Sequence, residues 1–401
     1  MKKRTLAGLI VICGAIAIAL AIAEIGLRLR MHRDEDGNCM FHSTRLRPFH
    51  PAVKRAEKII ARYQASTNSD LIYDAELGWT LRPLVDNHNK AGFVTTSPEV
   101  SVEKSSDRLR IALFGGSYTM GVFDKGWWRV LEESLNSAGI KAEVLNFGVS
   151  GFGMDQAYLR WKRDGVPYHA DLVIFGFVGG NCLDNENMMH MVKDPETSIP
   201  FTKPKFILDG AGGVKLVNSP TPSPEQIPEI MRHLDSWPPI QHEYFYAPDD
   251  FKMKPWRLSK LAAFIEGKMV NPRSEGALWD FYALQKEPAQ VALGITKQFA
   301  NEVTASGSLF WIAHLPHHTD LEQLQAHGKF QFQDLLDAVD KIAPTIHTEH
   351  ALLEACGNRP IEASYVEGHY KPELHAAVGH EIAAYIQKNL PGKLRPESGP
   401  K

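Results

Sequence analysis

The stretch RLRIALFGGSYTMG, residues 108–121, joins an apolar run to a serine that stands among glycines. Such apolar runs are typical of strands buried on both faces of a parallel sheet. The next segment, KGWWRVLEESLNSAG at 125–139, has the apolar spacing of an amphipathic helix. Ser117 therefore stands where a strand gives way to a helix, where N–H groups and the helix dipole favour a developing negative charge. This placement suits a nucleophile, although it also suits a serine that caps a helix in a tight glycine turn.

The alternation of strand and helix continues along the chain. Further strands are predicted at 141–149, 170–179, 308–316 and 343–350, and further helices at 154–165, 288–307 and 374–390. This order predicts a flavodoxin-like, doubly wound α/β sandwich around a central, mostly parallel five-stranded sheet. In such folds the ligands gather beyond the carboxyl ends of the strands.

The remaining segments divide the chain into regions. We expect a membrane anchor or signal segment at 1–30, a polar stalk or collar at 31–105 and the main domain at 106–392. Residues 186–280 interrupt the main domain with prolines and turns, as an insertion would, and they form either a lid over the site or a decoration of the fold. The tail at 393–401 is expected to be disordered.

The composition excludes one class of partner. The chain of 401 residues has 44 Lys and Arg against 47 Asp and Glu, a formal net charge of -3. Because there is no basic excess, we expect no nucleic-acid partner. The four cysteines have no paired C-x-x-C spacing and no density that suggests a disulfide scaffold, so they settle neither metal binding nor redox compartment. We expect no cofactor.

The N-terminus carries the strongest signal for location. A basic cap, MKKRT, precedes an uncharged apolar run at 6–23. A helix of this length covers roughly 27 Å, close to the hydrocarbon thickness of a bilayer. We expect an uncleaved anchor with the body of the chain extracytoplasmic, periplasmic or at the cell surface. Ala21 and Ala23 also fit a signal-peptide cleavage site before Glu24, and cleavage would give a secreted protein.

A nucleophilic serine needs a base to take its proton and donors to hold the oxyanion. Gly151, in NFGVSGFGMDQ after the second strand, can bring a backbone N–H close to a ligand because no side chain intervenes. Asn181, in GFVGGNCLDN after the third strand, offers a side-chain amide. Near the C-terminus, YVEGHYKPELHAAVGHEIA places His369 just before a helix and two residues after Glu367. These pieces fit one mechanism.

Taken together, the motifs resemble those of the SGNH hydrolases, also called GDSL-like lipases or esterases. In that family a G-D-S-x-x-x-G-like block carries the nucleophile, a later Gly and an Asn complete the oxyanion hole, and a D-x-x-H or D-x-H block supplies acid and base. The resemblance covers roughly 110–185 and 285–390 and implies the SGNH hydrolase fold. The stretches NFGVSGFGMDQ and GGNCLDN look especially like the membrane-anchored bacterial members.

Carried over residue by residue, the resemblance implies Ser117 as the nucleophile, His369 as the general base and Glu367 as its acid. The oxyanion donors it implies are the N–H groups of Ser117 and Gly151 and the amide of Asn181.

This sequence departs from the family pattern at two positions. Gly116 stands where the family usually has an aspartate before the serine, which mainly affects the turn. Glu367 replaces the usual Asp and is one methylene longer, and a shift of about 1 Å in a catalytic group can cost on the order of a hundredfold in rate. Three arrangements stay open: a compensating backbone, a Ser–His dyad whose ring is oriented by a water or a carbonyl, or a degenerate site.

A second group of histidines lies after the fourth strand, in HLPHHTD at 314–320. A zinc site needs three or four ligands that converge, and adjacent histidines on one loop rarely do. We expect a solvated loop at the edge of the cleft and no metal site among His314, His317, His318 and Asp320.

The resemblance implies a serine esterase or acylhydrolase that forms an acyl-enzyme on Ser117. Its substrate would be an ester, O-acetyl or another acyl group, on a lipid, a small molecule or an envelope polysaccharide. Two alternatives remain: an O-acyltransferase that acts on an exported polysaccharide, and a catalytically degenerate carbohydrate-binding protein with the same fold. The substrate cannot be read from the fold.

Overall fold

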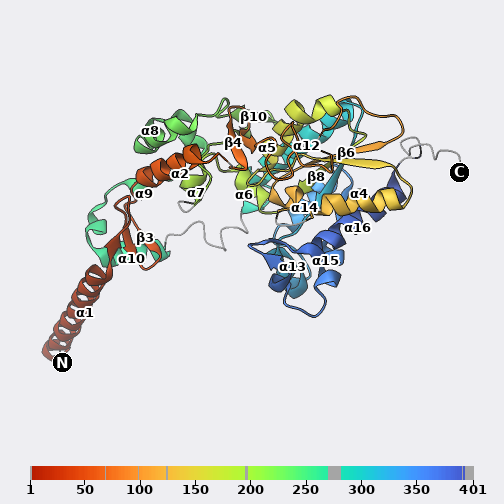
Figure 1. Ribbon diagram of the computed structural model, residues 1–401. Coiled ribbons are helices and arrows are strands. Elements are labelled where there is room, and N and C mark those ends of the chain that lie inside the picture. Colours follow the sequence, from red (N-terminus) through yellow and green to blue (C-terminus); the bar gives the residue numbers. More distant parts are fainter. Residues whose placement is uncertain are drawn as a thin grey trace. The chain divides into compact units, whose positions relative to one another are not determined.

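The computed structural model describes residues 2–67, 69–97, 99–122, 125–194, 197–269, 281–390 and 392 (Figure 1). The chain forms two compact units. Unit 1 comprises Met1–Ala65, His190–Pro200 and Pro224–Ala277, and unit 2 comprises Ser66–Met189, Phe201–Ser223 and Leu278–Lys401. The regions expected as a stalk (31–105) and as an insertion (186–280) are each shared between the two units. The tail expected at 393–401 lies outside the described residues.

Unit 2 is built on a five-stranded sheet in which every pairing is parallel. Its strands are β6 (Leu109–Phe114), β7 (Ala142–Asn146), β8 (Leu172–Phe177), β11 (Leu309–His314) and β12 (Thr345–His347), in the order β12-β11-β8-β6-β7. Numbered along the chain this is the order 2-1-3-4-5 of doubly wound, flavodoxin-like sheets. The predicted fold class is confirmed.

The central strands are apolar because helices cover the sheet. All residues of β6 and β8 are buried, as expected for parallel strands packed on both faces. On one side, Phe299 of α12 (Glu287–Ala305) packs against Phe114 and Phe175. The other helices of unit 2 are α3 (Ser117–Met120), α4 (Trp127–Ser137), α5 (Met154–Arg160), α6 (Asn181–Asn185), α13 (His318–His327), α14 (Gln333–Val339), α15 (Glu349–Cys356) and α16 (Pro372–Asn389).

Helices α4 and α16 pack closely because of one glycine. A Cβ on Gly379 of α16 would lie 2.7 Å from the carbonyl oxygen of Trp127 and 2.6 Å from Cβ of Val130. Trp127 and Trp128, at the start of α4, are both fully buried. This pair of tryptophans therefore belongs to the core of unit 2.

Three short hairpins complete unit 2: β4 (Leu71–Asp74) with β5 (Gly78–Leu81), β9 (Lys205–Leu208) with β10 (Val214–Val217), and β13 (Tyr365–Val366) with β14 (His369–Tyr370). Two buried lysines fix the segment around β9. Lys203 pairs with Asp155, and Nζ of Lys205 lies 2.5 Å from Oε2 of Glu186. Part of the predicted insertion is therefore tied into unit 2 by buried charge pairs.

Unit 1 begins with α1 (Lys2–Arg30), a long apolar helix. Residues Gly8–Arg30 are long and apolar enough to cross a membrane, and an 18-residue window within them has a mean hydropathy of 2.6. The other elements of unit 1 are β1 (His32–Arg33), β2 (Cys39–Phe41), β3 (Thr44–Leu46), α2 (Val53–Ala65), α7 (His190–Lys193), α8 (Ile227–Arg232), α9 (Pro248–Phe251) and α10 (Lys260–Met269).

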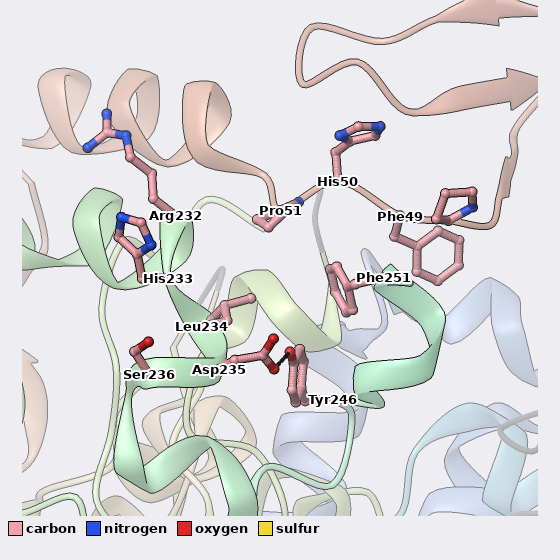
Figure 2. Close-up of a pocket in the computed structure, with 11 residues that line it drawn as sticks. Phe49, His50, Pro51, Arg232, His233, Leu234, Asp235, Ser236, Tyr246 and Phe251 are labelled. Carbon is pink, nitrogen blue, oxygen red and sulfur yellow. Dashed lines mark hydrogen bonds between the residues drawn. The ribbon is translucent and has the colours of Figure 1, made fainter. Parts of the chain in front are cut away.

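Unit 1 also contains a pocket of about 400 Å³ (Figure 2). Its lining includes the aromatic side chains of Phe49, Tyr246 and Phe251, and Tyr246 donates a hydrogen bond to Asp235 there. The site residues predicted from the sequence all belong to unit 2.

Candidate active site

Ser117 is the first residue of α3 and follows the carboxyl end of β6 by two glycines. As a helix N-terminal residue its N–H has no intrahelical acceptor. A Cβ on Gly116 would lie 2.9 Å from the carbonyl oxygen of Phe152. Any side chain before the serine would therefore press on the main chain of the neighbouring loop. This contact explains why glycine stands where the related motif has aspartate.

The structure brings His369 onto the serine. Nε2 of His369 lies 2.8 Å from Oγ of Ser117, although the two residues are 252 positions apart in the sequence. This is the distance at which a neutral imidazole accepts a proton from a hydroxyl. The nucleophile and base predicted from the sequence thus lie in hydrogen-bond contact.

The other ring nitrogen of His369 faces main chain. Nδ1 lies 3.0 Å from the carbonyl oxygen of Glu367, and the Glu367 side chain is exposed. Glu367 and Gly368 have φ of 48° and 77°, as in the type I′ turn that commonly closes a two-residue hairpin. The turn carries the Glu367 carbonyl to the imidazole. Of the three arrangements left open by the sequence, this geometry corresponds to a Ser–His dyad oriented by a carbonyl.

Three tyrosine hydroxyls hold the β13–β14 hairpin in place. Tyr118, the residue after the serine, donates a hydrogen bond to the carbonyl oxygen of Gly368. Tyr365 and Tyr370 both donate to the carbonyl oxygen of Pro316, at 3.2 and 3.0 Å. Sequence reasoning missed these residues. The only signal was the pair of tyrosines that flank the turn in YVEGHY.

Asn181 lies beside the serine turn and, like Asn185 on the same helix, has a buried Nδ2 without a partner among the described residues. It is only 8 % exposed, and its Nδ2 has no hydrogen-bond partner among the described residues. Buried amide donors are nearly always paired, so an unpaired one calls for an explanation. A Cβ on Gly116 would lie 3.5 Å from this nitrogen, which places the free amide beside the peptide that leads into Ser117.

Gly151 lies in the loop after β7, with φ of 79°. This left-handed conformation is costly for residues with a side chain. The next residue, Phe152, is the one whose carbonyl oxygen approaches Gly116. The loop that contains Gly151 therefore runs beside the serine turn.

Burial lowers the pKa of His369 below its usual value of 6.5, and the Glu367 carbonyl and carboxylate offset this only in part. The pKa of the neighbouring His317 is lowered more strongly. Burial, together with His318 and His369, lowers the pKa of His317 to about 4. Both imidazoles are therefore neutral at pH 7, the form in which His369 can accept a proton.

The histidines of HLPHHTD do not converge on one point. His317 caps α13, where its Nδ1 accepts a hydrogen bond from the N–H of Thr319 at 3.3 Å. Asp320 accepts a hydrogen bond from the N–H of His317 at 2.9 Å. His318 lies 3.6 Å from Glu322 on the same helix.

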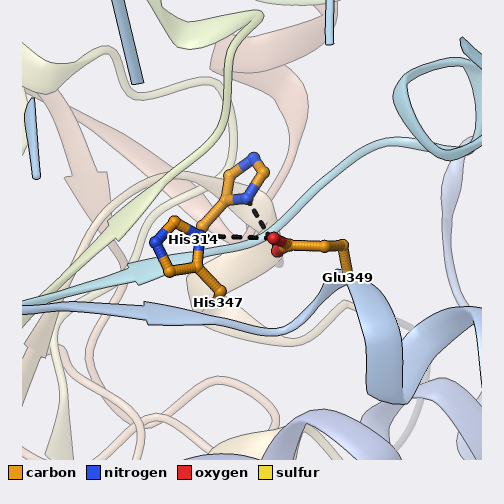
Figure 3. A group of neighbouring side chains, drawn as sticks. All are labelled: His314, His347 and Glu349. Carbon is orange, nitrogen blue, oxygen red and sulfur yellow. Dashed lines mark hydrogen bonds and ion pairs between the residues drawn. The ribbon is translucent and has the colours of Figure 1, made fainter. Parts of the chain in front are cut away.

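His314 instead meets two residues from other elements (Figure 3). His314 and His347 end the adjacent strands β11 and β12, and Glu349 begins α15. Nδ1 of His314 lies 3.2 Å from one Glu349 oxygen, and Nδ1 of His347 lies 3.3 Å from the other. On its far side, Nε2 of His347 lies 3.3 Å from Asp340.

These three side chains form a hydrogen-bonded group. Burial alone would raise the pKa of the Glu349 carboxyl, but hydrogen bonds from His314 and His347 outweigh it and hold the pKa well below its usual value. The same contact raises the pKa of His347.

A metal held by this trio would leave one polar group unpaired. It would bind Nδ1 of His314, which places a proton on Nε2, and that buried nitrogen has no partner among the described residues. Ligand histidines almost always donate that second N–H. The trio therefore fits a structural hydrogen-bonded group better than a metal centre.

No protein-family model and no curated protein match the chain. Among solved structures it is similar to Axe2, an acetylxylan esterase from Geobacillus stearothermophilus, with a TM-score of 0.39 and 10% identity over 70% of this chain and 96% of that one. It is also similar to a putative GDSL-like lipase from Parabacteroides merdae, with a TM-score of 0.38 and 11% identity over 72% of this chain and 100% of the other. Similarity at this level assigns no role to individual residues of this chain.

Proposed function

We propose that the protein is a serine esterase that cleaves an acyl ester through an acyl-enzyme on Ser117. The observation that carries the proposal is the 2.8 Å contact between Ser117 Oγ and His369 Nε2, together with an unpaired, buried amide beside the same serine. A serine that merely capped a helix would need neither a histidine base nor a free donor.

In the proposed first step His369 takes the hydroxyl proton as Ser117 Oγ attacks the ester carbonyl carbon. The carbonyl oxygen becomes an oxyanion held by the N–H groups of Ser117 and Gly151 and by the amide of Asn181. His369 then gives its proton to the departing alkoxide, which leaves as an alcohol, and the acyl group stays on Ser117. Water then gives a proton to His369 as it attacks the acyl-enzyme, and His369 returns that proton to Ser117 Oγ as the carboxylic acid is released.

The Glu367 carbonyl fixes which nitrogen of His369 acts as the base. It can only accept a hydrogen bond, so it holds the proton of the neutral ring on Nδ1 and leaves the lone pair on Nε2 facing the serine. A carbonyl carries no full negative charge. The imidazolium that forms during the reaction is therefore stabilised less than it would be beside a carboxylate.

The proposed substrates are acetyl or other acyl esters on a lipid, a small molecule or an envelope polysaccharide. The solved structures to which the chain is similar are named as an acetylxylan esterase and a putative GDSL-like lipase, and both names denote enzymes that act on esters. We further propose that α1 spans a membrane and that the remaining chain lies outside the cytoplasm, which fits the length and hydropathy of Gly8–Arg30.

The test uses the full chain in detergent, with a fluorophosphonate probe and p-nitrophenyl acetate. The parent should be labelled and should release acetate. Ser117→Ala should lose labelling and at least about a thousandfold in hydrolysis rate. Ser134→Ala is the matched control, because Oγ of Ser134 also lies 3.1 Å from a histidine nitrogen, of His380, but on the surface. A folded parent that neither labels nor hydrolyses would refute the proposal.

A further inference from the structure

The helix α1 is fixed to unit 1 by a charged residue at the end of its apolar stretch. The carboxylate of Glu24 accepts hydrogen bonds from the main-chain N–H groups of Lys260 and Leu261, at 2.9 and 2.7 Å, and from the hydroxyl of Ser259, at 2.9 Å. These are the donors that the start of α10 leaves without intrahelical acceptors. A carboxylate of α1 therefore caps α10.

Arg28, one turn further along α1, strengthens this junction. Its Nε donates to Glu24 at 2.6 Å, and its Nη2 donates to the carbonyl oxygen of Leu258 at 2.8 Å. The end of α1 is thus held by hydrogen bonds to both sides of the turn that precedes α10. Within unit 1, the helix is a fixed part of the structure.

The segment 252–268, which contains this junction, exposes large apolar side chains. Met253, Trp256, Leu258 and Ile265 are 60%, 50%, 65% and 43% exposed. Ile25 and Leu29, on the last turns of α1, are exposed as well. Single exposed apolar residues are ordinary, but a group of them around one junction marks an interaction surface.

The charges of the same segment favour an anionic partner. It carries four lysines, Lys252, Lys254, Lys260 and Lys268, and one buried arginine, Arg257, against one acidic residue, Glu266. Lys252 and Lys254 lie 3.8 and 2.9 Å from Asp249, just before the segment, and no ion pair is recorded for Lys260 and Lys268 among the described residues. Glu266 is paired with Arg257 at 2.7 Å. Long basic side chains next to a tryptophan are typical of segments at the headgroup level of a bilayer.

We infer that segment 252–268 lies on the membrane surface, with Trp256 and Leu258 in the interfacial layer and the lysines at the lipid headgroups. The inference rests on the proposed membrane span of α1. If α1 crosses the bilayer, its apolar run ends at Glu24, so the residues bonded to Glu24 and Arg28 lie at the same level. The partner of this surface is therefore the bilayer in which α1 is inserted.

Tryptophan fluorescence tests the inference in the full chain, reconstituted into vesicles of phosphatidylcholine and phosphatidylglycerol. Apart from Trp256, every tryptophan in the described residues is buried within the protein, and α1 contains none. Brominated lipids should quench part of the emission. Trp256→Phe should abolish most of this quenching, whereas Trp237→Phe, a buried tryptophan of the same unit, should retain it.

Two outcomes would overturn the inference. One is lipid quenching that is unchanged in Trp256→Phe. The other is stronger quenching by a lipid spin label deep in the acyl chain than by a shallow one, which would contradict an interfacial position. Alkaline extraction of the vesicles separates this failure from failure of the anchor. A chain that resists extraction while Trp256 is not quenched keeps the anchor and loses only the surface contact.

Discussion

Two histidine centres lie at the carboxyl edge of the same sheet in unit 2, and they are built in opposite ways. In one, His314 and His347 share the carboxylate of Glu349, and the second ring nitrogen of His347 lies 3.3 Å from Asp340. In the other, His369 contacts a serine hydroxyl and a main-chain carbonyl. The first centre holds a carboxylate between its rings, and the second holds the hydroxyl of Ser117 against one ring.

The difference extends to the surrounding polar groups. Beside the serine, the amide of Asn181 is buried without a partner, a state that costs about 1–3 kcal/mol. A protein keeps such a cost where a ligand atom supplies the missing partner. The other centre also has a buried nitrogen without a partner among the described residues, Nε2 of His314. With its proton on Nδ1 facing Glu349, that nitrogen is an acceptor, whereas Nδ2 of Asn181 is always a donor. The two centres therefore differ in the kind of group left unpaired, a donor beside the serine and an acceptor in the group around Glu349.

After the loss of Ser117 itself, the largest effect is expected from removal of the unpaired donor. Asn181→Ala should lower kcat for ester hydrolysis on the order of a hundredfold or more, because one of the three proposed oxyanion donors is lost. Its thermal stability should be equal to or greater than that of the parent, since the donor has no partner among the residues that the structure describes. Kinetics with p-nitrophenyl acetate and thermal unfolding measure the two quantities.

Asn185, on the same helix, provides the control. Its Nδ2, like that of Asn181, has no partner among the described residues, but its Oδ1 accepts a hydrogen bond from the N–H of Met154 at 2.9 Å. Asn185→Ala should therefore lower the free energy of unfolding by about 1–3 kcal/mol. An Asn181→Ala variant that loses stability but keeps its kcat would show that Asn181 is structural and would remove the contrast between the two centres.

The next effect is on the pH dependence of the reaction. Burial lowers the pKa of His369, and His369 must be neutral to act as a base. Hence kcat/KM should rise about tenfold per pH unit at acid pH and reach its plateau with a midpoint below 6.5. A midpoint above 6.5 would mean that a carboxylate, as at His347, stabilises the imidazolium.

A smaller effect on activity and a clear one on stability are expected at the other centre. Glu349→Ala removes the acceptor of the buried His314 Nδ1–H and should cost about 1–3 kcal/mol of unfolding free energy, with kcat changed only slightly. Glu354→Ala, an exposed position on the same helix, should be within about 0.5 kcal/mol of the parent. Denaturant unfolding compares the two variants.

The pH dependence of that loss follows from the two pKa shifts. The pKa of Glu349 is held below 4.5, so its stabilisation is present above that pH and is lost as the pH falls. The pKa of His347 is raised above 6.5, so its stabilisation is present below 6.5 and is lost as the pH rises. The difference between parent and Glu349→Ala should be greatest between pH 4.5 and 6.5. A difference that grows toward alkaline pH would contradict this assignment.

The sequence predicted the sheet well because its signal is local. The buried strand β8 is a continuous apolar run and β6 is apolar except for Arg110, and the order of strands and helices allows few topologies. It also predicted Ser117 and His369 as site residues, each next to a strand end or a helix start, and the structure brings their side chains within 2.8 Å of each other. The group formed by His314, His347 and Glu349 could not be found this way, because it depends on the register between β11 and β12.

The orientation of His369 was beyond the sequence for a similar reason. Glu367 at two residues before the histidine fits both a carboxylate contact and a carbonyl contact, and only the φ values of the turn distinguish them. The bonds from Tyr118, Tyr365 and Tyr370 that hold this turn connect segments far apart in the chain.

The smallest change in activity is expected from substitution of Glu367. This substitution tests most directly whether the two histidine centres differ in how the histidine is oriented. Because His369 uses the carbonyl of this residue, Glu367→Gln should change kcat/KM by less than about threefold, a small difference in transition-state energy. Gly368→Ala should do more harm, since φ is 77° there and a Cβ would lie 3.2 Å from Nε2 of His317. This order, with the glycine more sensitive than the acid, would establish that the turn and not the carboxylate orients the base. If Glu367→Gln were instead the more damaging variant, the carboxylate would take part in the reaction, and the two histidine centres would be alike.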